Sequence, residues 1–463
     1  MVFRICSFLK LSAAWEPSAK GGGPTPDRSR GKKMRREMLM TVTEKCVAWV
    51  LGFLLTVAAT PVLAQQAYET PHPLNAADVL PSSLIKGPFH RIDNKVLNDG
   101  YMNTYTVRST FGDLQVVSTA ALKLRVEELS AVDAMRQVEE TDTFQQSLAE
   151  SVQNTVDGVV NIVDDPKAAF SGAVTGIGKV FQRASEAIQS SPGAGEDSRM
   201  ENLIGYSNTK REYAHAFGVD VYSPNSVLQQ QLDEMAKAGY AGSISVTALK
   251  ALIPGGVGLA LSVTGSTQLL NDLIATTPPT ELRSINRDRL SAMNIPPDLI
   301  DLFIDKTVFT PRDQTLIVAS LERLPKTQGR SEFIKFAIST ETEDMAAFRT
   351  RVAMMYAVYN QKQSPIDSFV YTSPVLLAKA GDTLVFIVPV DHLFWTPHTD
   401  HILREINRVA AKLGGIEKKQ LWLAGTLTDA SRIGIKDLGW EVFTNSDESL
   451  NWHDISANGA PKS

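Results

Sequence analysis

The chain has 463 residues, of which 43% are hydrophobic and 21% are charged, and its formal net charge is −5. This apolar fraction is sufficient for a buried core, which excludes collagen-like, disulfide-scaffold and wholly disordered chains. Only one segment approaches transmembrane length, so a multi-span membrane protein is excluded. The charge gives no overall basic footprint, and we therefore expect no nucleic-acid partner.

The N-terminal region has the pattern of an export signal. Residues 34–64 combine a basic start, an apolar stretch from Cys46 to Ala59 and small residues before a cut between Ala64 and Gln65. These are the three parts of a secretory signal peptide. The apolar stretch has 14 residues, fewer than the about 20 that span a bilayer. Cleavage is therefore expected, and an uncleaved N-terminal anchor is the alternative.

Residues 1–33 do not fit an exported protein, because they place basic residues far upstream of the apolar stretch. We interpret them as a non-native extension upstream of a true start at Met34, or as a disordered extension. Removing residues 1–64 leaves 399 residues, with 36 basic and 47 acidic side chains and a net charge of −11. Both cysteines are also lost, so thiol chemistry and disulfides are excluded from the expected cysteine-free mature chain.

The mature chain is predicted to open with an irregular lead-in at 65–95, which is rich in Pro, Ala and Ser. A β-hairpin follows, because Tyr101–Ser109 and Leu114–Ser118 have strand composition and flank Gly112-Asp113. Apolar residues spaced by three and four then predict a helix over Ala120–Glu140.

Two further helices complete the predicted segment 96–189. Residues 143–163 are amphipathic, and Asp165-Pro166 signals the start of a helix over Lys167–Gln189. That last helix contains three glycines, each of which costs about 1 kcal/mol relative to alanine in a helix interior. Close packing against another helix or a membrane would offset the cost.

A linker is predicted at 190–199, where Ser, Pro and Gly gather. Residues 200–361 then predict a compact helical domain, because helical patterns dominate them. Its expected helices are Glu201–Phe217, Pro224–Ala238, Ser243–Leu252, Leu282–Met293, Pro297–Lys306, Pro311–Leu324 and Met345–Tyr359.

Residues 362–463 predict a small α/β domain with the element order ββαβαβ and a mixed sheet. The expected elements are strands Phe369–Ala378 and Thr383–Val390, helix His401–Leu413, strand Leu421–Gly425, helix Asp429–Leu438 and strand Trp440–Phe443. All four tryptophans of the mature chain lie in this domain. The expected fold class is α+β and mainly helical, with a helical core, an N-terminal β-hairpin and this C-terminal domain.

Three of the seven histidines fall in the segment Asp391–His401, with the sequence DHLFWTPHTDH. Imidazole and carboxylate ligands together suit zinc, iron or manganese. We therefore name one candidate metal site, and its expected ligands are His398, Asp400, His401 and Glu405. The alternative is structural: Thr396 or Asp400 caps a helix that has Pro397 in its first turn.

The part TPHTDH, residues 396–401, partly resembles the HxHxDH motif of metallo-β-lactamase-like hydrolases. In that family the motif follows a strand and opens a helix. Thr396 stands in place of the first histidine, and only about 60 residues follow, fewer than the family's later ligands require. The family assignment is therefore not adopted, and a metal-dependent hydrolase is kept as an alternative function that rests on the candidate ligands alone.

Two further segments are candidate binding sites. Gly425–Thr428 lies between a strand and a helix and is a potential anion site, although a short loop with a threonine cap is the favoured interpretation. Ala251–Gly265 has no charge over 15 residues and could contact a membrane. Buried core helices are favoured there, because the length is too short to span and basic residues are few.

The sequence therefore predicts an exported protein, periplasmic or secreted, of unknown activity. We expect it to act without catalysis through contacts with an envelope protein, with the tryptophan-bearing domain as a contact surface. No cofactor is expected. The alternatives are the metal-dependent hydrolase and a peripheral membrane protein that uses its glycine-rich helices.

Overall fold

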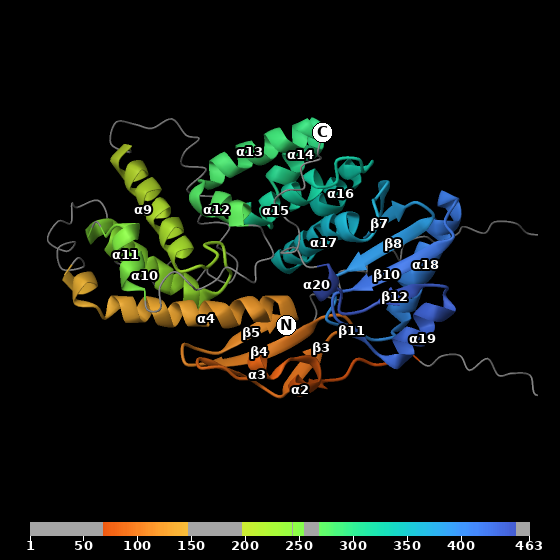
Figure 1. Ribbon diagram of the computed structural model, residues 1–463, viewed down its shortest axis with the longest axis horizontal. Helices are drawn as coiled ribbons and strands as arrows, with labels where there is room; N and C mark the ends of the chain where they lie inside the picture. The colour runs from red at the N-terminus through yellow and green to blue at the C-terminus, as the bar shows by residue number, and fades with distance from the viewer. Residues whose placement is uncertain (1–67, 147–196, 243, 254–267, 451–463) are drawn as a thin grey trace, which may run out of the picture. The chain divides into compact units, whose positions relative to one another are not determined.

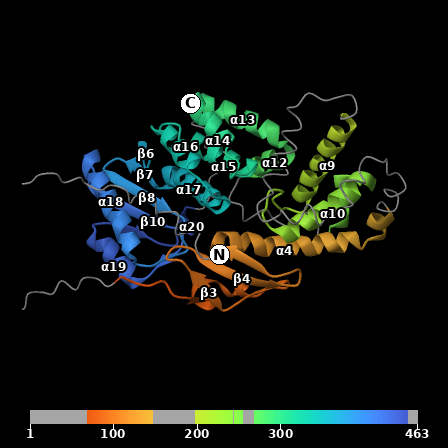
Figure 2. The same cartoon turned by 180° about the vertical axis from the view of Figure 1, so that it is seen from behind.

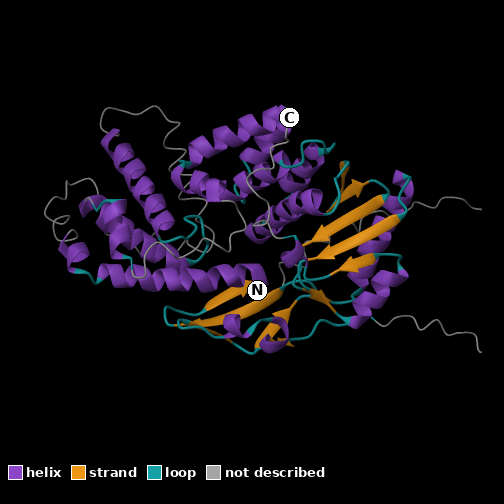
Figure 3. Ribbon diagram, in the orientation of Figure 1, coloured by secondary structure: helices purple, strands orange, loops and turns teal. Residues whose placement is uncertain are grey.

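A computed structural model describes residues 68–146, 197–242, 244–253 and 268–450 (Figure 1). The described elements belong to one compact unit, Glu69–Ser463. Helices dominate and the strands form separate sheets (Figure 3), so the predicted α+β, mainly helical class is confirmed. The predictions for 1–33, for 34–64, for most of 143–189 and for 254–265 lie outside the described residues.

The N-terminal sheet has five strands where one hairpin was expected. They are β1 (Leu74–Asn75), β2 (His90–Ile92), β3 (Lys95–Asn98), β4 (Asn103–Ser109) and β5 (Leu114–Val117). The hairpin itself is confirmed as the antiparallel pair β4–β5. The prediction of an irregular lead-in was wrong, because this segment contains two short helices, α2 (Ala76–Val79) and α3 (Ser82–Ile85), as well as β1, β2 and the start of β3. These short strands form by antiparallel pairing with their neighbours. A local sequence pattern does not reveal such pairing.

One long helix, α4 (Thr119–Glu139), covers the N-terminal sheet (Figure 1). Its residues Leu122 and Leu129 are fully buried in a core shared with Tyr105 and Val107 of β4. The periodicity predicted this helix within a residue at each end, because a one-sided apolar stripe recurs every three or four residues.

The helices between residues 197 and 362 form most of the largest core. They are α9 (Asp197–Ala216), α10 (Ser226–Gly242), α11 (Val246–Leu252), α12 (Gln268–Thr276), α13 (Pro279–Ala292), α14 (Pro297–Ile304), α15 (Pro311–Glu322), α16 (Arg330–Ile338) and α17 (Glu343–Lys362). Proline in the first turn starts three of them, and Thr310 with Asp313 closes a capping box on α15. Two helices, α12 and α16, were not predicted, and α9 begins at Asp197, inside the expected linker 190–199.

The C-terminal sheet has the strand order β12-β10-β8-β7-β6. Its strands are β6 (Ser368–Thr372), β7 (Val375–Ala380), β8 (Thr383–Val388), β10 (Lys418–Leu423) and β12 (Glu441–Phe443). β10 runs parallel to β8 and β12, whereas β6, β7 and β8 pair antiparallel, so the predicted mixed sheet is confirmed. The strand expected over Phe369–Ala378 is two strands, because Ser373-Pro374 forms a turn between β6 and β7.

Helices cover both faces of this sheet. α17 contacts β8 from one side, while α18 (Pro397–Leu413) and α19 (Asp429–Asp437) connect the parallel strands and share the second core (Figure 2). The short strands β9 (His392–Leu393) and β11 (Thr426–Leu427) pair in parallel just beyond β8 and β10. The loops at the carboxyl ends of β8 and β10 therefore lie side by side, and they contain the segments singled out in the sequence.

Candidate functional site at the carboxyl ends of the parallel strands

The segment Asp391–His401 joins β8 to α18 and lies against the N-terminal sheet. The turn between β3 and β4 pairs with it: the carbonyl of Tyr101 accepts from the N–H groups of Asp391 and His392, at 3.0 and 3.2 Å. The carbonyl of Gly100 accepts from the N–H of Phe394 at 3.0 Å. This segment therefore forms part of the junction between two sheets that are almost 300 residues apart in sequence.

Asp391 is the buried centre of that junction. Its carboxylate accepts from the backbone N–H of Asn103 and from the N–H of Thr119, the first residue of α4, both at 3.0 Å. Burial raises the pKa of this carboxyl, while the two N–H donors oppose the rise. A carboxylate at a helix start is stabilised by the unpaired N–H groups and the helix dipole. Asp391 thus holds α4 and β4 against the C-terminal domain.

The four expected metal ligands each interact with a different partner. Asp400 is buried and accepts from Arg404 through both oxygens at 2.9 Å, and Glu405 pairs with Arg408. His401 is 59% exposed, and its Nδ1 lies 4.0 Å from Glu405. His398 stands edge-on to Tyr101, with 6.4 Å between ring centroids. Across the part of the chain that the structure describes, no three His, Cys, Asp or Glu side chains form a group suited to a metal.

The first turn of α18 is capped in the way that the structural alternative expects. Thr396 is the N-cap and accepts from the N–H of Thr399 at 3.2 Å, with Pro397 at the first helical position. The helix start predicted at His401 is four residues late, and the structural alternative, with Thr396 as the cap and Pro397 in the first turn, gave the correct start.

Two histidines of this segment have lowered pKa values. Desolvation lowers the pKa of His392, with His72 adding to the effect and Glu69 opposing it. Burial also lowers the pKa of His398, and the nearby His401 contributes. Both imidazoles are therefore held towards their neutral forms.

Glu69 was not recognised from the sequence, yet it links both loops. One of its carboxylate oxygens accepts from the N–H of Trp395 at 2.7 Å and from the hydroxyl of Thr428 at 2.6 Å. Its own N–H donates to the carbonyl of Trp395 at 2.7 Å. No local pattern marks Glu69, because its partners lie more than 300 residues further along the chain.

The loop Gly425–Thr428 has the threonine cap that was favoured for it. Thr428 is the N-cap of α19 and accepts from the N–H of Ser431 at 3.1 Å. Gly425 lies so close to Asp391 that an added Cβ would be 1.9 Å from the Asp391 carbonyl oxygen. The glycine is therefore required by the close approach of the two loops.

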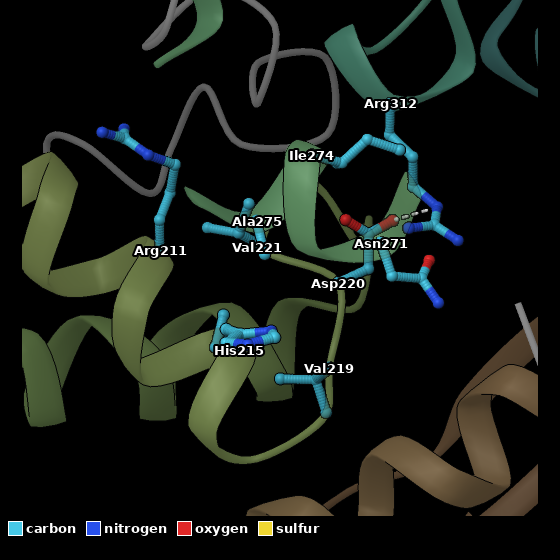
Figure 4. A pocket seen from close by; sticks show the side chains of 10 residues that line it. Arg211, His215, Val219, Asp220, Val221, Asn271, Ile274, Ala275 and Arg312 are labelled. Atoms are coloured by element: carbon cyan, nitrogen blue, oxygen red, sulfur yellow. Dashed lines mark ion pairs between the residues drawn. The ribbon is translucent and has the colours of Figure 1, made fainter. Parts of the chain in front are cut away.

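A small pocket lies between α9, α12 and α15, away from these loops (Figure 4). It contains about 280 Å³ of empty space, part of which is open solvent. Asp220 and Arg312 pair across it at 3.4 Å, and His215 lies near Asp272 at 3.8 Å. Arg211 extends away from the Asp220–Arg312 pair (Figure 4). The charged groups therefore do not converge on a common point.

The tryptophans expected at a contact surface lie in the interior. Trp395, Trp422 and Trp440 are each at most 5% exposed, and Trp452 lies outside the described residues. Trp395 packs against α19 so tightly that a Cβ at Gly434 would be 2.3 Å from its ring. These three side chains fill the cores of the C-terminal domain. The prediction that they form a contact surface was therefore wrong.

No family model, curated protein or solved structure matches the chain significantly. Among the described helices, none is both long enough and apolar enough to cross a bilayer.

Proposed function

We propose that the chain is an exported protein, periplasmic or secreted, whose mature form starts at Gln65 and which acts by binding a partner rather than by catalysis. The expected cut lies a short distance before the compact unit, with residues 65–68 between the cut and the start of the unit at Glu69. This coincidence carries the proposal. A cut after Ala64 leaves every described contact of Glu69 intact, so the mature chain keeps the hydrogen bonds that join Glu69 to Trp395 and Thr428.

The binding role is supported by how the segment Asp391–His401 is used. Asp391, Thr396 and Asp400 are engaged in the junction, a helix cap and an ion pair, respectively. A substrate that displaced these side chains would break those contacts and lower the stability of the fold. The two alternative functions are a metal-dependent hydrolase and a peripheral membrane protein.

The full chain should be produced in a Gram-negative host and the periplasmic fraction isolated. We expect a product whose N-terminal sequence begins at Gln65, and we expect Ala64→Lys to block processing because the cleavage site requires a small residue. The matched control is Thr43→Lys, which lies in the basic start before the apolar stretch and should leave processing unchanged. Crosslinking in the same fraction should yield one specific partner. An unprocessed chain confined to the cytoplasm would contradict export, and a processed chain without any crosslinked partner would contradict the binding role.

A further inference from the structure

We draw no further inference here: the strongest candidate, the pocket between α9, α12 and α15, carries nothing, because Asp220 and Arg312 already pair with each other across it and Arg211 extends away from that pair (Figure 4), so that its charged side chains face no common ligand.

Discussion

At the scale of single residues, His392 shows how desolvation makes stability depend on pH. Burial lowers its pKa below the ordinary value of 6.5. Between the folded and unfolded pKa values, the unfolded state binds more protons, so the free energy of unfolding falls as the pH falls through that range. We expect His392→Gln, which keeps a polar group beside Thr426 but cannot be protonated, to lose less stability than the wild type between about pH 7 and pH 5. Urea unfolding at each pH measures this difference.

The matched control for that experiment is Gln361→Ala, which changes an exposed residue that does not titrate. Its stability should follow the wild-type dependence on pH. The interpretation fails if His392→Gln loses as much stability on acidification as the wild type does.

At the scale of elements, Asp391 fastens the start of α4 to the C-terminal domain. Asp391→Asn replaces one acceptor oxygen by an amide nitrogen that faces a backbone N–H, so one of the two bonds to Asn103 and Thr119 is lost. We expect a loss of about 1–3 kcal/mol in the free energy of unfolding, and faster amide hydrogen exchange in the first turn of α4. Asp382→Asn, on an exposed turn, should change neither. Unchanged exchange at Thr119 in the Asp391 variant would contradict this role.

The same elements show what a sequence can and cannot predict. α4, α15 and α17 were found because a stripe of apolar residues or a cap signal lies within each of them. β2 and β3 were missed because they are short and depend on pairing with β4. The segment Asp391–His401 was correctly singled out, yet its neighbours Glu69, Asn103 and Thr119 come from the other end of the chain. Hydrogen bonds between such distant residues leave no local pattern, so the candidate site could be predicted only in part.

At the scale of the whole molecule, we expect two truncations, one on each side of the segment Glu69–Asn75, to differ in stability. Removing residues 1–64 leaves the compact unit from Glu69 onward complete, so its free energy of unfolding should match that of the full chain. Removing residues 1–75 also deletes Glu69 and β1, including three hydrogen bonds to the loops before α18 and α19. Each such bond contributes about 1 kcal/mol, so we expect a loss of about 2–4 kcal/mol by chemical denaturation. Equal stability of the two truncated chains would show that Glu69–Asn75 does not stabilise the contact between the N-terminal sheet and the C-terminal domain. A large loss of stability on removing residues 1–64 alone would show that an essential contact lies before the expected cut.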